Sequence, residues 1–267
     1  ALVRWVNQDC IRWIYLTKPS IPVAMNVGLS AAANEIVLFL DDDIIPGQVL
    51  IKIHSEGYRD ESICAIAGQV LQPEEKSGSS ATAYKKNGLQ RYMDFPFWSD
   101  QQALIENGMA GNLSVRKKYA LQVGGFDENY VGVAYRFETD FCRRLCRGGG
   151  NILFEPAASI RHLRADRGGT RKYGTHLCSY RPHHGVGDYY FALQNGTFSE
   201  SLPYILCRPF KEISTRFHLR KPICIPVKLF GEMLALCWAL WLYVRGSKYR
   251  NCPTNGGSAN SSAEAGN

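Results

Sequence analysis

Residues 35–43 read Glu35-Ile36-Val37-Leu38-Phe39-Leu40-Asp41-Asp42-Asp43, an apolar run that ends in three carboxylates. The five apolar residues, which include β-branched and aromatic types, predict a short buried strand. Because a buried strand does not accommodate three negative charges, the carboxylates are expected at its carboxyl end, where open α/β sheets bind ligands. Asp41 and Asp43 would there form an oxygen-ligand site for Mg²⁺ or Mn²⁺. A solvated acidic turn is the alternative interpretation.

The composition is that of a globular protein with a basic excess. Of the 267 residues, 45% are hydrophobic and 21% are charged, and this length predicts one catalytic-size domain with an appendage. The net charge of +7 and the pI of about 8.9 indicate an anionic partner: a nucleotide, an anionic lipid surface or nucleic acid.

The nine cysteines are an odd number and lack paired metal-site spacing. With no signal peptide ahead of them, they favour reduced thiols and a cytoplasmic protein. Cys142 and Cys146, four residues apart, are interpreted as packing residues on one helix face. The chain begins at Ala1 without a leading Met, which leads us to expect a fragment.

Around the acidic run, the pattern predicts alternating strands and helices. Strands are expected at 11–16, 36–40 and 63–71, with helices at 23–34 and 46–58, an order that favours a mainly parallel sheet. Further along, helices are expected at 117–123 and 137–147, from Asp188 onward, and at 227–244. Short strands at 152–154 and 158–161 lead to His162.

Two segments do not follow this periodicity. Residues 72–99 begin with Pro, Gly, Ser and Lys and continue with an aromatic cluster, which predicts either a substrate- or membrane-facing flap or a local insert packed by its own aromatics. Residues 161–181 are basic and glycine-rich. We expect one domain over 1–198, a helical extension over 199–250, and a disordered polar tail over 251–267.

Four strings in chain order resemble the family 2 glycosyltransferases, which have the GT-A fold. They are AMNVGLSAAANEIVLFLDDDIIP, GNLSVRKKYALQVGGFDENY, FETDFCRRL and SIRH, and they lie within residues 11–162. The resemblance implies an α/β fold with a mixed, mainly parallel sheet flanked by helices, followed by a C-terminal helical extension. It also implies inverting, metal-dependent transfer of a sugar from a nucleoside-diphosphate donor, of UDP or dTDP type, to a hydroxyl of a glycan or lipid-linked acceptor.

The same resemblance implies roles for the carboxylates and the histidine. Asp43 would bind Mg²⁺ or Mn²⁺, Asp41 would contact the metal and the ribose or donor sugar, and Glu138 would be the catalytic base. Asp140 would orient Glu138 or bind the acceptor. His162 would be a third metal ligand or a phosphate contact, unless it only ends a strand.

Other positions are assigned to substrate binding on the same basis. Asn26, Gly111 and Asn112 would line the donor or acceptor pocket, although a glycine there also suits close packing. Arg164 and Arg167 would clamp the diphosphate, and a solvated basic face is the alternative.

The chain departs from the family pattern at both ends. No segment before residue 11 matches the first strand that grips the base, so the nucleotide pocket is expected to lack one wall. The QxxRW signature of processive synthases is also missing, which favours transfer of a single sugar.

Two other functions fit parts of the sequence. A nucleotidyltransferase also uses a carboxylate-bound metal, but this chain has no Gly-rich phosphate loop near its start. A non-catalytic basic module for nucleotide or membrane-surface binding is the second alternative; the acidic run argues against nucleic acid.

The apolar residues 227–244 carry Lys228 and Glu232 near their start and have basic residues on both sides. With 18 residues the run is at the lower limit for spanning a bilayer. We expect a helix lying on the cytoplasmic face of a membrane, with the two charges reaching toward the headgroups; a buried helix is the alternative.

Overall fold

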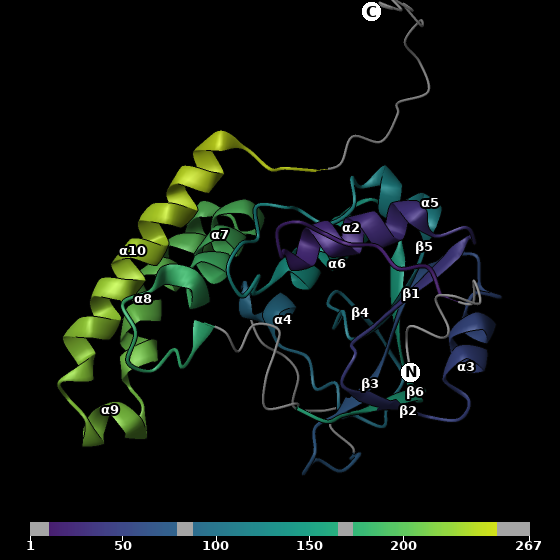
Figure 1. Cartoon of the computed structure of the whole chain (residues 1–267), viewed down its shortest axis with the longest axis horizontal. Coiled ribbons are helices and arrows are strands. Elements are labelled where there is room, and N and C mark those ends of the chain that lie inside the picture. Colours follow the sequence, from purple (N-terminus) through teal and green to yellow (C-terminus); the bar gives the residue numbers. More distant parts are fainter. Residues whose placement is uncertain (1–10, 79–87, 165–172, 250–267) are drawn as a thin grey trace, which may run out of the picture.

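The computed structural model describes residues 11–78, 88–164 and 173–249. Over these residues a mixed β-sheet is flanked by helices, and a group of C-terminal helices lies beside it (Figure 1). The α/β fold class predicted from the sequence is therefore confirmed. The six strands of the sheet are β1 (Ile36–Leu40), β2 (Ile44–Pro46), β3 (Ile63–Leu71), β4 (Ala103–Ile105), β5 (Asn112–Arg116) and β6 (Asn151–His162).

The strand order is β1-β5-β3-β6-β2, and β4 also pairs with β6. β3 and β6 pair in parallel, whereas the other four pairings are antiparallel. The expectation of mainly parallel pairing was therefore wrong. β1, β3 and β6 do point the same way, but β5 runs in the opposite direction between β1 and β3. A sequence pattern of apolar runs does not reveal this insertion.

Strand β6 is one long strand rather than the two short ones predicted. Its register with β3 shifts between the pairs Gly68–Glu155 and Gln69–Ser159, and Pro156 lies in this irregular part. Proline cannot donate a hydrogen bond to a neighbouring strand, so it is tolerated at such a break. The first part of β6 pairs with β4 and its last part pairs with β2.

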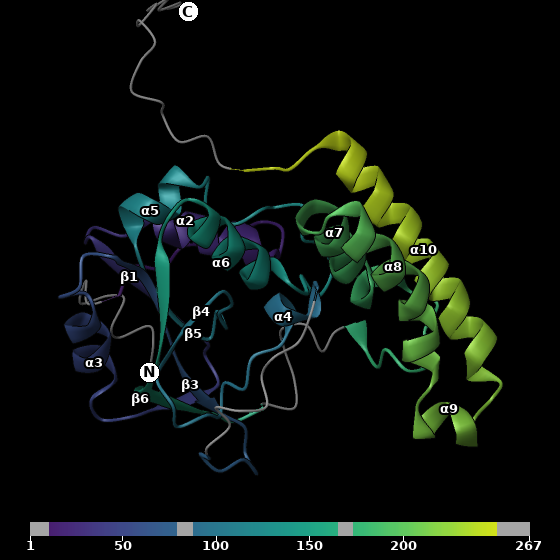
Figure 2. The same cartoon turned by 180° about the vertical axis from the view of Figure 1, so that it is seen from behind.

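Helices cover both faces of the sheet. One apolar cluster joins Leu29 of α2 (Ile21–Ala31), Phe39 of β1 and Phe141 of α6 (Phe137–Arg147). A second cluster joins Leu50 of α3 (Leu50–Gly57) to Ile160 of β6, and figures from opposite sides place α3 away from α2 and α6 (Figures 1 and 2). Shorter helices α4 (Gln90–Met93) and α5 (Lys117–Gln122) complete this part.

Residues 11–16 do not form the predicted first strand. They have no regular secondary structure, and Trp13 and Tyr15 are mostly exposed. The Arg12 guanidinium donates to the carbonyl of Ala31 at the end of α2, and residues 11–16 pair with no strand of the sheet. An apolar, β-branched run predicts a strand only if a neighbouring strand is available to pair with it.

The C-terminal helices share the core of the sheet domain. They are η2 (Pro182–His184), α7 (Val186–Asn195), α8 (Phe198–Ile213), α9 (Arg216–Arg220) and α10 (Cys224–Arg245). Tyr189 and Phe191 of α7 and Ala239 of α10 belong to the same apolar cluster as Phe39 and Phe141. The division at residue 198 stays a prediction, and the predicted tail over 251–267 lies outside the described residues.

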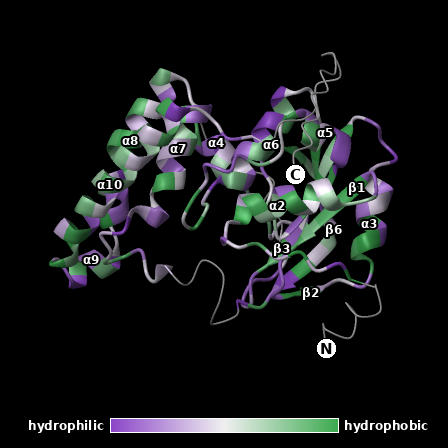
Figure 3. Ribbon diagram, turned by 45° about the horizontal axis from the view of Figure 1, so that its top comes forward, coloured by the Kyte–Doolittle hydropathy of each residue, from purple (hydrophilic) through white to green (hydrophobic). Residues whose placement is uncertain are grey.

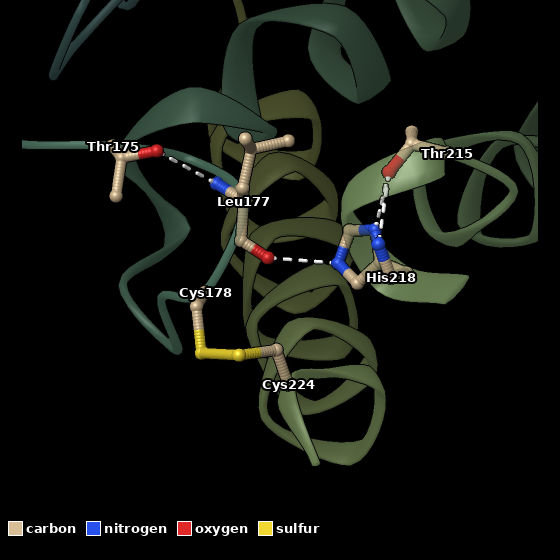
Figure 4. The surroundings of a disulfide bond; sticks show 6 residues. All are labelled: Thr175, Leu177, Cys178, Thr215, His218 and Cys224. Atoms are coloured by element: carbon tan, nitrogen blue, oxygen red, sulfur yellow. Dashed lines mark hydrogen bonds between the residues drawn. A yellow bond between two sulfur atoms is a disulfide. The ribbon is translucent and has the colours of Figure 1, made fainter. Parts of the chain in front are cut away.

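A disulfide joins Cys178, which precedes η2, to Cys224 at the start of α10 (Figure 4). Next to it, the carbonyl of Leu177 accepts a hydrogen bond from Nε2 of His218 at 2.8 Å. The expectation that all the cysteines are free thiols was therefore wrong for this pair, because helix packing brings together two residues that are 46 positions apart. Cys142 and Cys146 of α6 are free thiols that pack in or against the apolar core, as expected for packing residues.

Candidate active site

Asp41, Asp43 and His162 meet at one end of the sheet. Asp41 directly follows β1, and the antiparallel pairing of β2 with β6 places Ile44 opposite His162. The carbonyl of Asp43 also accepts a hydrogen bond from the amide of Leu163 at 2.8 Å. As a result, Nε2 of His162 lies 3.1 Å from an Asp43 carboxylate oxygen and 3.8 Å from one of Asp41.

This trio has the geometry and chemistry of a divalent cation site. One ligand atom from each side chain lies within 4.8 Å of the others. Carboxylate oxygens with one imidazole nitrogen suit Mn²⁺ or Mg²⁺. Burial raises the pKa of Asp41, and the charges of Asp43 and Asp42 raise it further while His162 lowers it. Because the carboxylates repel one another, a bound cation would relieve an existing electrostatic cost. The residues present therefore fit the metal.

Gly111 lies against the Asp41 carboxylate. A Cβ atom at Gly111 would come within 2.3 Å of an Asp41 carboxylate oxygen, and the amide of Asp41 donates to the carbonyl of Gly111 at 3.4 Å. A side chain at position 111 would push Asp41 away from its partners. Of the three residues assigned to the pocket, Gly111 therefore lies beside Asp41, a member of the trio.

Glu138 lies in the first turn of α6 and is partly buried. Burial raises the pKa of its carboxyl to about 7; the positive charge of Arg136 lowers it and the negative charge of Asp41 raises it. Glu138 is therefore close enough to Asp41 to sense its charge. It lines a cleft of about 420 Å³ whose other walls include Phe97, Trp98 and Tyr135. A carboxyl group with a pKa near neutrality, at the wall of a cleft, has the properties of a general base.

The backbone before α6 is strained where it borders this cleft. Ala134 and Arg136 have φ angles of 54° and 72°, in the left-handed region that non-glycine residues rarely adopt. Arg136 is held there by its guanidinium, which donates to Asp188 at 2.9 Å and to the carbonyl of Met93 at 2.5 Å. These contacts fix the start of α6 and hence the position of Glu138.

Asp140 does not share the surroundings of Glu138. It is buried, and its two carboxylate oxygens accept hydrogen bonds from Arg144 at 2.9 Å and from Asn195 at 2.8 Å. The bond to Arg144 lies within α6, and the bond to Asn195 connects α6 to α7. The structure thus gives Asp140 a role in holding two helices together, and both of its oxygens are engaged there.

Asn26 and Asn112 are also buried and engaged within the protein. The amide group of Asn26 donates to the carbonyl of Phe126 at 2.9 Å and accepts from its amide at 2.8 Å, which fixes the turn before residue 127. Asn112 donates to the carbonyl of Ala158 at 2.7 Å, and its oxygen lies 2.9 Å from Nε2 of His54. Neither side chain is placed at the cleft.

Of the two arginines assigned to the diphosphate, Arg164 is described and Arg167 lies outside the described residues. Arg164 lies two residues after the end of β6 at His162, with φ in the left-handed region. Its guanidinium donates to the side chain of Gln72 at 2.8 Å. Arg164 is therefore near the trio in sequence, and its observed partner belongs to the 72–99 segment.

A second, larger cavity of about 770 Å³ was not predicted from the sequence. It lies between the sheet domain and α8, and it shares Asp94, Tyr135 and Arg136 with the cleft of Glu138. Its residues are spread over five segments of the chain, so no local motif marks it. The signal that was available is the high density of charged and aromatic residues in α8, including Tyr204 and Arg208.

No family model matches the chain, and no curated protein matches it. Two solved structures that are similar to it are glycosyltransferases. Mannosyltransferase PcManGT from Pyrobaculum calidifontis, in complex with GDP-Man and Mn²⁺, is 15% identical with a TM-score of 0.48, over 92% of this chain and 65% of that one. GalNAc-T7 with UDP, GalNAc and Mn²⁺ is 13% identical with a TM-score of 0.42, over 85% of this chain and 43% of that one. This chain covers less than two thirds of the length of either glycosyltransferase. Both TM-scores are below 0.5.

Proposed function

We propose that this chain is a metal-dependent glycosyltransferase that moves a sugar from a nucleoside diphosphate to a hydroxyl of a glycan or lipid-linked acceptor, with inversion. The observation that carries the proposal is the presence of two complementary groups in the same domain. Asp41, Asp43 and His162 form a cation-type trio, and Glu138, whose pKa is raised to about 7 by burial at a cleft wall, interacts electrostatically with Asp41. Along the chain, these residues occur in the same order as the motifs that resemble those of family 2 glycosyltransferases.

In this proposal each residue has one task. Asp41, Asp43 and His162 would hold Mn²⁺ or Mg²⁺. When bound, the cation would neutralise the charge that develops on the departing diphosphate. Glu138 accepts the proton of the acceptor hydroxyl as that oxygen attacks the anomeric carbon from the face opposite the leaving group. A single displacement of this kind inverts the configuration at that carbon. Gly111 leaves room for Asp41.

The donor class and the location in the cell complete the proposal. We propose a pyrimidine nucleotide donor, of UDP or dTDP type, and an enzyme at the periphery of the cytoplasmic face of a membrane. The disulfide between Cys178 and Cys224 removes the cysteine argument for a reducing compartment, so this location rests on the likeness to the family and on the apolar α10 alone.

The test is nucleotide binding measured by calorimetry with and without Mn²⁺. We expect UDP or dTDP to bind more tightly in the presence of Mn²⁺, and we expect EDTA to remove the difference. A matched set with ATP and CTP tests the nucleotidyltransferase alternative, because that enzyme would bind the triphosphates preferentially. Nucleotide binding that does not respond to Mn²⁺ would contradict the proposed metal-dependent reaction.

A further inference from the structure

The two charged residues in the first half of α10 point into the protein. Nζ of Lys228 lies 2.9 Å from Glu212 of α8 and 2.8 Å from Glu232. Glu232 also pairs with Arg208 of α8 and accepts a hydrogen bond from Tyr189 of α7 at 3.0 Å. The expectation that Lys228 and Glu232 would reach toward headgroups was therefore wrong. Because the Lys228 and Glu232 side chains are both buried, the exposed side of α10 carries neither charge.

That opposite side of α10 is apolar along its length. Every exposed residue between positions 226 and 244 is apolar or aromatic, or is Cys237. Phe230, Trp241 and Val244 are 50%, 53% and 83% exposed. Among the described helices, α10 is the one that length and composition would allow to cross a membrane, and 33% of its apolar window is buried. An exposed apolar surface of this extent marks an interaction site.

Helix α8 has a second apolar stripe. Phe198, Leu202, Leu206 and Phe210 recur every four residues and are all exposed. Residues at this spacing lie on one side of a helix. Both views of the ribbon place α8 beside α10, and the hydropathy colouring shows apolar segments along both helices (Figures 1, 2 and 3).

The charges near these helices are of one sign at the surface. Arg216, Arg220 and Lys221 are exposed in and just after α9, which connects α8 to α10. The three acidic residues between positions 196 and 249 are all engaged: Glu200 in the capping box of α8, and Glu212 and Glu232 in the ion pairs described above. An apolar surface with basic residues at one end is complementary to a bilayer with anionic headgroups.

We propose that the outer sides of α8 and α10, with the basic residues of α9, form a surface that docks on an anionic lipid bilayer. At 1.5 Å per residue, α10 is about 33 Å long, enough to span a bilayer. However, its inner side packs on α7 and η2 and closes the ion pairs with Arg208 and Glu212. Spanning would expose these charges to lipid, so α10 lies on the membrane with the helices that it covers.

The experiment is flotation of the purified full chain with vesicles of phosphatidylcholine, alone or mixed with phosphatidylserine. We expect the wild type to float with both, and more strongly with phosphatidylserine. The variant F210S/F230S/W241S should lose at least about tenfold in partitioning, because three large apolar side chains no longer enter the bilayer. The variant R216Q/R220Q/K221Q should lose only the increase that phosphatidylserine provides.

The matched control is I51S/L104S, which removes two side chains that are 75% and 65% exposed on α3 and β4. It should float as the wild type does. The proposal is overturned if the wild type does not float, or if F210S/F230S/W241S floats equally well. It is also overturned if light scattering shows a wild-type dimer that F210S/F230S/W241S converts to a monomer without vesicle binding, because the surface would then join two copies. No donor or acceptor is needed for these measurements.

Discussion

Asp42 and Asp43 are adjacent residues of the same type with different surroundings. Asp43 faces His162 beside the end of β6, whereas Asp42 is exposed and outside the trio. This difference arises because Ile44, the first residue of β2, pairs with His162 of β6. The pairing brings Asp43, the residue before Ile44, next to the histidine. The pair therefore allows a comparison between the proposed metal ligand, Asp43, and a neighbour, Asp42, that would contribute charge alone.

We expect Asp43→Ala to abolish Mn²⁺ binding and Asp42→Ala to weaken it only slightly. A hard cation needs the carboxylate oxygen that Asp43 supplies, while Asp42 contributes longer-range attraction that solvent screens. Calorimetric titration with Mn²⁺, in the absence of any nucleotide, measures both. Equal loss in the two variants would show that the acidic run acts through charge and holds no defined site.

Glu138→Gln tests the raised pKa of Glu138. The folded protein holds this proton up to a pKa of about 7, whereas the unfolded chain releases it near 4.5. The resulting stabilisation is complete below pH 4.5 and is lost as the pH rises to about 7. Gln stays uncharged, so the variant should match the wild type at low pH and exceed it at pH 8, by up to about 3 kcal/mol in unfolding free energy. Urea unfolding at several pH values measures this.

The same substitution should lower sugar transfer by about 10²–10⁴-fold while donor binding persists, since the proposed general base is removed. In the wild type, the rate should rise as the pH passes through about 7. Asp140→Asn is the contrasting variant: it breaks the ion pair with Arg144 and should lower stability more than the rate of transfer. A variant Glu138→Gln that is fully active would place the base elsewhere.

The candidate residues that the structure brings together differ in kind from those that it places elsewhere. Asp41 and Asp43 come shortly after the apolar strand β1, and His162 is the last residue of β6, so the strand ends predict where these side chains lie. Asn26 and Asp140 bind partners that are 100 and 55 residues away, Phe126 and Asn195. Whether a polar residue in a motif faces a cleft or the core depends on such distant partners, and local pattern does not contain them.

At the level of elements, the strongest periodic segments were predicted most accurately. β3 and α6 have the predicted bounds, and the predicted strand at 36–40 is β1. The errors occur where pairing decides the outcome: residues 11–16 lack a partner strand, and β5 runs antiparallel between β1 and β3. Apolar composition indicates burial, but direction and neighbours follow from the whole sheet.

Gly111 lies against the Asp41 carboxylate at the end of β1, so a substitution at this position should affect Mn²⁺ binding. Gly111→Ala would place a methyl group where the Asp41 carboxylate lies, so Mn²⁺ affinity should fall at least about tenfold with little loss of secondary structure. Gly28→Ala is the matched control, because its new Cβ would meet nothing within 4 Å in α2. It should leave Mn²⁺ binding unchanged and stabilise the helix by up to about 1 kcal/mol. Unchanged Mn²⁺ affinity in Gly111→Ala would separate Asp41 from the metal site.

The disulfide joins two elements, the segment before η2 and the start of α10. Cys224→Ser should lower the unfolding free energy by about 2–4 kcal/mol, since a cross-link between residues 46 positions apart restricts the unfolded chain. Cys237→Ser, on the exposed side of the same helix, should have almost no effect. Dithiothreitol should lower the melting temperature of the wild type and leave that of Cys224→Ser unchanged. Equal melting temperatures of wild type and Cys224→Ser without reductant would contradict the cross-link.

At the scale of the whole molecule, the two halves of the structure are joined by apolar packing and by buried charges. Aromatic residues of α7 extend the core of the sheet toward α10. Asp188 of α7 pairs with Arg136, which borders the cleft of Glu138, and with Arg208 of α8 at 3.0 Å. Through Arg208 the same chain of ion pairs reaches Glu232 on α10. The helices that carry the proposed bilayer surface are thus tied to the wall of the cleft.

Arg208 is the central member of this chain, so its removal tests the connection. Arg208→Met preserves the length of the side chain but leaves Asp188 and Glu232 with one cation fewer in a buried setting. Breaking a buried ion pair in this way costs about 3–5 kcal/mol of unfolding free energy. The exposed Arg220 on α9 provides the matched control, and Arg220→Met should change stability by less than about 0.5 kcal/mol. Urea unfolding of both variants gives the difference. Equal stabilities would mean that solvent reaches these charges, and that α10 is held to the domain by apolar contacts alone.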